Sequence, residues 1–158
     1  MSIEKVRAYL NEMNCPKKIL EFETSSATVE LAAQAAGVIP ARISKTLCLM
    51  SKDGPIVIAV AGDTKIDNRK FKDTFALKAK MLTPEETLEA TGHAVGGVCP
   101  FALPEGTNAY ADISMKRFET VFPAAGSSNS AVELTCDELF HFGKCIAWVD
   151  ICKGWEEE

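Results

Sequence analysis

The chain has 158 residues, a length typical of one domain with one core, and we expect a single domain over residues 1–158. Hydrophobic residues make up 47% of it, yet no apolar run approaches the roughly 20 residues of a membrane-spanning helix. The net charge of −5 argues against indiscriminate nucleic-acid binding. The first residues are amphipathic and carry acids, unlike a secretory signal, so we expect a cytoplasmic protein without membrane contact.

Apolar periodicity and turn signals predict the elements in chain order. Helices are expected at 2–13, 27–36, 67–74, 84–92 and 135–143, with one helical turn at 114–118. Strands are expected at 19–22, 45–50, 56–61, 78–82, 108–112, 120–122, 131–134 and 145–151. Asp53-Gly54 marks a hairpin between two of them. This order favours an α+β (mixed α/β) fold with a curled, barrel-like mixed sheet of about seven strands surrounded by helices.

The six cysteines lack CxxC spacing, and we expect reduced thiols. Cys48 and Cys145 lie inside apolar strands, where cysteine acts as a small hydrophobe. Cys99 alone is placed in a loop where it could meet a ligand. The two histidines are far apart and show no paired ligand spacing, so neither a metal nor a cofactor is expected.

The stretch Thr91–Leu103, TGHAVGGVCPFAL, concentrates glycines and a proline. Such a composition excludes a regular helix and predicts a loop that offers backbone N–H and C=O groups to a ligand. An ordinary connector between a helix and a strand fits the pattern equally well. Within the stretch, His93 is interpreted as a helix cap or a loop-stabilising donor rather than a general base.

Positive charge is concentrated at two places. Lys45 opens an apolar strand, where an ammonium suits binding a phosphate or polarising a carbonyl, although an ordinary strand-end charge is the alternative. Residues 63–80 carry six Lys or Arg against three acids, which fits either an anionic partner or a solvated helix face.

Four segments together resemble the YbaK/EbsC family, whose domain also occurs as the editing insertion of bacterial prolyl-tRNA synthetases. They are ARISKTLCL, AGDTKIDNRKF, TGHAVGGVCPF and FPAAGSSNSAVEL, and the resemblance covers about residues 24–139. It implies a free-standing editing hydrolase that removes a small wrong amino acid from a tRNA, with tRNA(Pro) the plausible acceptor. The implied partners are the 3′ acceptor end of aminoacyl-tRNA, with an aminoacyl-tRNA synthetase as a possible second one, and no DNA.

The resemblance also implies site residues. Lys45 matches the family lysine and would hold the terminal adenosine and its phosphate. The family's GxxxP loop matches Gly96–Pro100 and would grip the aminoacyl group. Expected substrate-binding residues are Thr28, Thr46, Gly96, Gly97, Val98, Cys99, Pro100, Ala124, Gly126, Ser127, Ser128 and Asn129. Expected tRNA-binding residues are Lys65, Arg69 and Lys72, because Arg69 and Lys72 share a helix face that Lys70 does not.

Departures from the family bear on the substrate. Cys99 precedes the loop proline where relatives often carry Ser or Gly, and Ala124 and Ala131 stand where cysteinyl-tRNA-specific members carry Ser and Asp. These small residues leave alanine, serine, threonine or another small amino acid as the substrate. Two other functions stay open: a non-catalytic module that binds an aminoacyl or nucleotide group, and a thiol redox protein that uses Cys99.

Overall fold

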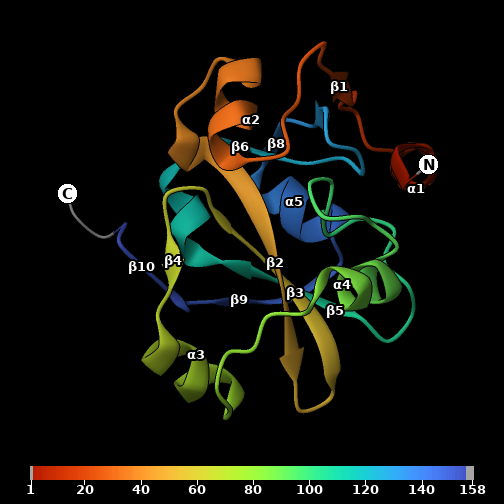
Figure 1. Cartoon of the computed structure of the whole chain (residues 1–158). Helices are drawn as coiled ribbons and strands as arrows, with labels where there is room; N and C mark the ends of the chain where they lie inside the picture. Colours follow the sequence, from red (N-terminus) through yellow and green to blue (C-terminus); the bar gives the residue numbers. More distant parts are fainter. Residues whose placement is uncertain (1, 156–158) are drawn as a thin grey trace.

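The computed structural model describes residues 2–155. Its helices are α1 (Ser2–Glu12), α2 (Val29–Ala36), α3 (Asn68–Phe75), α4 (Pro84–Thr91) and α5 (Cys136–Phe142), with 3-10 turns η1 (Pro40–Arg42) and η2 (Ile113–Arg117). The strands are β1 (Leu20–Glu21), β2 (Ile43–Ser51), β3 (Gly54–Ala61), β4 (Lys65–Ile66), β5 (Asn108–Asp112), β6 (Thr120–Pro123), β7 (Ser130–Ala131), β8 (Leu134–Thr135), β9 (Cys145–Val149) and β10 (Cys152–Lys153). Figure 1 shows their arrangement.

A curled six-stranded sheet forms the centre, in the order β8-β6-β2-β3-β5-β9. The β2–β3 hairpin is antiparallel from Ser44 opposite Ala61 to Ser51 opposite Gly54, as the Asp53-Gly54 signal predicts. Strands β3, β5 and β9 run parallel, and β6 is parallel to β2 but antiparallel to β8. The predicted class, a mixed sheet curled and flanked by helices, is confirmed.

The central strand β3 is buried on both faces, which explains its continuous apolar sequence. Val57, Ala59 and Ala61 pack into a core cluster that includes Val6 of α1 and Leu139 of α5. The alternate residues of β3, from Ile56 to Val60, pack into a second cluster with Phe71 of α3. A third, smaller cluster lies under α2 and joins Ala32 and Ala33 to Ile43, Phe122 and Ala131.

Two predicted strands are wrong in detail. Residues 78–82 form no strand, because their pairing with β2 is limited to one antiparallel bridge between Met81 and Leu49. Its two hydrogen bonds run from Met50 N–H to the Lys80 carbonyl oxygen and from Leu82 N–H to the Cys48 carbonyl oxygen. The predicted strand at 131–134 is broken into β7, which pairs with β1, and β8, which pairs with β6.

The sequence also gave no sign of β4 and β10, which pair with each other. Each has two residues, too few to show a two-residue period. Across residues 2–155, no helix is long and apolar enough to cross a membrane.

Candidate functional site

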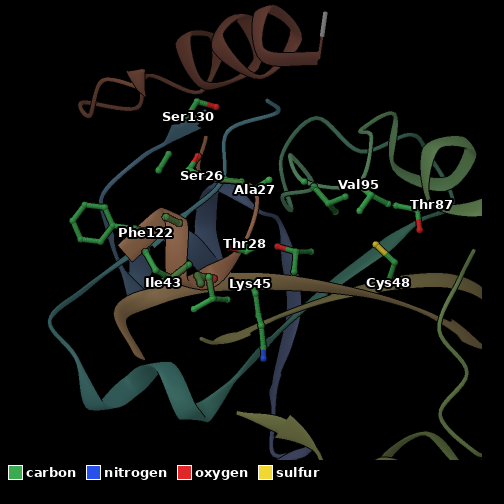
Figure 2. A pocket seen from close by; sticks show the side chains of 18 of the residues that line it. Ser26, Ala27, Thr28, Ile43, Lys45, Cys48, Thr87, Val95, Phe122 and Ser130 are labelled. Atoms are coloured by element: carbon green, nitrogen blue, oxygen red, sulfur yellow. The ribbon is translucent and has the colours of Figure 1, made fainter. Parts of the chain in front are cut away.

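A groove of about 340 Å³ crosses β2 and is walled by residues from five parts of the chain. Its lining residues are Ser26–Val29 and Ala32, Ile43–Thr46 and Cys48, Met81, Leu82, Pro84 and Thr87, Val95, Gly96 and Val98, and Phe122, Ala124, Ser130 and Ala131. Figure 2 shows Ser26, Ile43 and Phe122 toward one end and Cys48, Thr87 and Val95 toward the other, with Lys45 between them. Of the expected substrate-binding residues, the groove contains Thr28, Thr46, Gly96, Val98 and Ala124.

The alternation of β2 gives the groove a floor of small polar side chains. Successive strand residues point to opposite faces, so Ser44, Thr46 and Cys48 share one face. Cys48 belongs to the core cluster on that face, whereas Leu47 belongs to the cluster on the other. Sequence reasoning missed Ser44, although this two-residue period could have placed it beside Thr46.

Lys45 lines the groove, but its ammonium lies on the opposite side of β2. Figure 2 shows the side chain extending away from Ser26, Thr28 and Val95. The Nζ atom donates a hydrogen bond to the Thr64 carbonyl oxygen at 2.6 Å. Burial lowers the pKa of Lys45, while Asp63 and Glu30 act in the opposite direction and Lys65 adds to the lowering. The ammonium is therefore held at the edge of the groove, where β2 passes the start of β4.

The glycine loop and the loop after β6 form one wall of the groove together. Gly126 N–H donates to the Gly97 carbonyl oxygen at 3.1 Å. A Cβ atom on Gly97 would lie 2.7 Å from the Ser127 nitrogen and 2.9 Å from the Gly126 carbonyl carbon, so no larger residue fits. Gly96 has a φ of +101°, which favours glycine, and a Cβ atom there would lie 3.4 Å from the Cβ atom of Ala27.

His93 fixes the glycine loop from inside the protein and does not line the groove. Its ring is fully buried, with Nε2 donating to the Phe101 carbonyl oxygen at 2.8 Å and Nδ1 accepting from the Ser2 hydroxyl. Burial lowers the pKa of His93, and its bond to Phe101 opposes that shift only in part. The predicted loop-stabilising role of His93 is confirmed, since both ring nitrogens are bound.

Cys99 is buried in the core and is absent from the groove wall. Its sulfur lies 3.5 Å from Nε2 of His93, and burial raises its pKa to about 12. The structure therefore does not place this thiol where it can meet a ligand, because the loop folds it inward against α5 and β3. Pro100 faces a separate cavity of about 320 Å³ beside Tyr9 and Lys144.

The second predicted loop supports the wall from behind. Ser127 donates to Ser130 Oγ at 2.6 Å, and Asn129 Nδ2 donates to the Phe22 carbonyl oxygen at 3.0 Å. Ser26 N–H donates to the Ser128 carbonyl oxygen at 2.6 Å. Gly126, Ser127, Ser128 and Asn129 thus hold the start of α2 and β7 in place, while Ala124, Ser130 and Ala131 provide the groove surface.

Three hydroxyl groups of the groove are buried without a partner. Among the described residues, the buried side-chain oxygens and nitrogens that lack a hydrogen bond are those of Ser26, Ser44 and Thr46, and all three residues line the groove. Unpaired buried hydroxyls are uncommon in native proteins and cost about 1–3 kcal/mol each. A rotation about χ1 lets such a hydroxyl turn toward a bound molecule.

The groove lining given above contains no His, Asp or Glu, and its titratable side chains are Lys45 and Cys48. Burial raises the pKa of Cys48 to about 11, which keeps this thiol protonated near neutral pH. Over residues 2–155, no group of three or more His, Cys, Asp or Glu is arranged to hold a metal ion. The wall therefore offers hydroxyls and backbone groups, while the Lys45 ammonium is held by the Thr64 carbonyl on the opposite side of β2.

The cations of residues 63–80 differ in their pairing: within residues 2–155, Lys70 forms an ion pair, and Lys65, Arg69 and Lys72 form none. Lys70 donates to Asp150 at 3.1 Å and to the Cys152 carbonyl oxygen at 3.0 Å, so its ammonium is held against the segment from Asp150 to β10. Arg69 and Lys72 are exposed on α3, whose N-terminus is capped by Asp67. Lys65 is exposed on β4, next to the Thr64 carbonyl that holds Lys45.

The model of the aminoacyl-tRNA editing domain family matches residues 23–142, and the chain belongs to this family. This result confirms the family predicted from the sequence. The chain is 52% identical to protein YwhH of Bacillus subtilis (strain 168), over 99% of this chain and 100% of YwhH.

Part of the chain is also similar to a proline–tRNA ligase. The Thermotoga neapolitana enzyme is 34% identical over 56% of this chain, but that match covers 15% of the ligase. A solved structure of a protein proposed to be a trans-editing enzyme for prolyl-tRNA synthetase has a TM-score of 0.87 at 28% identity, covering 97% of this chain and 98% of that one.

Proposed function

We propose that this protein is a free-standing hydrolase that deacylates mischarged aminoacyl-tRNA carrying a small amino acid, with tRNA(Pro) as the acceptor. The observation that carries the proposal is the groove, which brings the Lys45 strand and the glycine loop of an editing-domain protein onto one cavity. Its volume of about 340 Å³ is near the lower end for small-molecule sites, so it accommodates the aminoacyl end and leaves the rest of a tRNA outside. Similarity to proline–tRNA ligases and to the proposed trans-editing enzyme supports the choice of tRNA(Pro).

The lining supports a small amino acid. Ala27, Ala32, Ala124 and Ala131 contribute methyl groups to the lining. Ala32 and Ala131 pack in one cluster with Ile43 and Phe122, and Ala124 bridges Ala131. One methylene changes binding by about 1–3 kcal/mol, so the size of this end is expected to separate small amino acids from larger ones. The pocket residues of the proposal are Thr28, Thr46, Gly96, Val98 and Ala124, to which we add Ser26 and Ser44. Gly97, Cys99, Pro100, Gly126, Ser127, Ser128 and Asn129 position them from behind.

The proposed reaction uses a water molecule rather than an enzyme nucleophile. The water oxygen attacks the ester carbonyl carbon, the bond from that carbon to the ribose oxygen breaks, and a proton passes from the water to the leaving ribose oxygen. Groove hydroxyls, loop backbone groups and the free ribose hydroxyl of the substrate orient the water and the developing oxyanion. Lys45 binds the phosphate of the terminal adenosine, and Lys65, Arg69 and Lys72 bind phosphates farther along the tRNA.

The test is deacylation of tRNA(Pro) charged separately with alanine, serine, threonine, cysteine and proline. We expect turnover of at least one small wrong amino acid and none of prolyl-tRNA. Lys45→Ala should lower kcat/KM by about 10- to 100-fold, because one charge-assisted contact contributes about 1.5–3 kcal/mol. The control is Lys52→Ala, which replaces an exposed lysine in the turn between β2 and β3 and should retain full activity.

A non-catalytic aminoacyl- or nucleotide-binding module is the second candidate. The observation that favours it is a groove lining without His, Asp or Glu. Binding of an aminoacyl-tRNA without turnover of any member of the panel would establish this alternative. The redox alternative has no support, since Cys99 is buried and its pKa is raised to about 12.

A further inference from the structure

Two exposed lysines lie directly opposite each other on a short ribbon, β4–β10, which packs with Leu47 on the face of β2 opposite the groove floor. Strands β4 and β10 are antiparallel, and Lys65 is the register partner of Lys153. Opposite residues of an antiparallel pair project to the same side with Cβ atoms about 4.5–5.5 Å apart, and like charges there are destabilising. The register thus places both lysine side chains on the same side of the ribbon.

This pair adjoins the ammonium end of Lys45, whose backbone lies at the groove. Thr64 immediately precedes Lys65, and its carbonyl oxygen accepts the hydrogen bond from Lys45 Nζ at 2.6 Å. We call Lys45, Lys65 and Lys153 the lysine track. Two members of the track act on neighbouring titratable groups. The pKa of Lys45 is lowered mainly by burial, and Lys65 lowers it further. The pKa of Asp67 is lowered mainly by hydrogen bonds from the Lys70 and Arg69 backbone, and Lys153 lowers it further.

Other cations nearby are already neutralised. Arg117 forms a two-pronged ion pair with Asp63 at 2.7 and 3.1 Å, and Lys70 pairs with Asp150. Within residues 2–155, by contrast, neither Lys65 nor Lys153 makes an ion pair. The exposed cations of this region that form no ion pair within residues 2–155 are therefore Lys65 and Lys153 on the ribbon and Arg69 and Lys72 on α3.

We propose that the lysine track binds the backbone phosphates of the single-stranded 3′ end of tRNA as it enters the groove, with Lys153 as a contact that the sequence did not indicate. The proposal rests on the proposed function. Lysine ammonium groups suit phosphates as point charges. An anion between Lys65 and Lys153 would also remove their mutual repulsion. The strand enters past β4 and β10, reaches Lys45 and then turns into the groove, where its aminoacyl end lies.

The test measures binding of uncharged tRNA(Pro) transcript to the full chain over a range of salt concentrations. Each phosphate contact with a single strand contributes about 0.7 to the slope of log K against log salt, so Lys65→Gln with Lys153→Gln should reduce the slope by roughly 1.4. The control, Lys18→Gln with Lys52→Gln, removes the same charge from exposed positions elsewhere and should leave the slope near that of wild type. A third variant, Arg69→Gln with Lys72→Gln, measures the contribution of α3 separately.

A transcript without its single-stranded 3′ end locates the contact. The effect of the Lys65/Lys153 double variant should disappear with this transcript. Three results would overturn the proposal: an equal slope change in the track and control variants, no slope change in either, or wild-type binding that does not respond to salt. In each case Lys65 and Lys153 serve only as charges that protect a sheet edge. Failure of the proposed function looks different: the slopes behave as expected, but no mischarged tRNA is deacylated.

Discussion

Replacing Ser44 by alanine should make the protein more stable. The side chain is 2% exposed on β2, and its hydroxyl has no partner among the described residues. Folding removes this hydroxyl from water without replacing its hydrogen bonds, which costs about 1–3 kcal/mol. Alanine avoids that cost and leaves a gap of only one oxygen atom. We expect the free energy of unfolding to rise by about 1 kcal/mol, or roughly 2–4 °C in Tm for a chain of this size.

Ser114→Ala is the matched control, and we expect it to lower the free energy of unfolding instead of raising it. Ser114 is also fully buried, but its Oγ accepts the Ala61 N–H at 3.1 Å, and Ala61 is the register partner of Ser44. Losing this acceptor leaves a buried N–H unpaired, so the free energy of unfolding should fall by about 1–3 kcal/mol. The same chemical change thus gives opposite results at two buried serines beside one strand residue.

Urea unfolding followed by circular dichroism measures both variants, and an unchanged m-value shows that the change lies in stability. If Ser44→Ala loses 1 kcal/mol or more, as Ser114→Ala should, then the Ser44 hydroxyl is paired in solution and our account of it is wrong. If the hydroxyl serves the substrate, the more stable Ser44→Ala variant should also deacylate more slowly, a trade-off common at functional sites.

Two further predictions concern the glycine loop. Gly97→Ala should lower the free energy of unfolding in the same urea assay by about 1–3 kcal/mol, because the new Cβ atom would lie 2.7 Å from the Ser127 nitrogen. A variant with wild-type stability would show that the two loops are not packed together. Cys99 should resist alkylation near pH 8 while the partly exposed Cys15 reacts, as measured by mass spectrometry. The reason is that burial raises the pKa of Cys99 from 9.0 to about 12. Ionisation of this thiol therefore lowers the stability of the folded protein only as the pH rises above 9. Labelling of folded Cys99 at the rate of Cys15 would contradict this placement.

The elements with strong local signals could be predicted from the sequence. The predicted helices at 27–36 and 84–92 lie within two residues of α2 and α4, which are capped by Thr28 and Gly37 and by Thr83 and Gly92. Local hydrogen bonds and left-handed φ angles determine such boundaries, so a few adjacent residues suffice. The apolar runs of β2 and β3 were equally clear, because a strand buried on both faces needs apolar residues along its length.

Tertiary structure decided which residues meet at the groove. The loop sequence suggested an accessible Cys99, but in the fold the thiol is buried in the core. His93 holds this loop through hydrogen bonds to Ser2 and Phe101, which lie 91 and 8 residues away in the sequence. Ser26 and Ser44 lie far apart in the chain, and they line one groove only after α2 packs against the start of β2. The pairing of Lys65 with Lys153 has the same origin, since two strands of two residues have no signature until they meet.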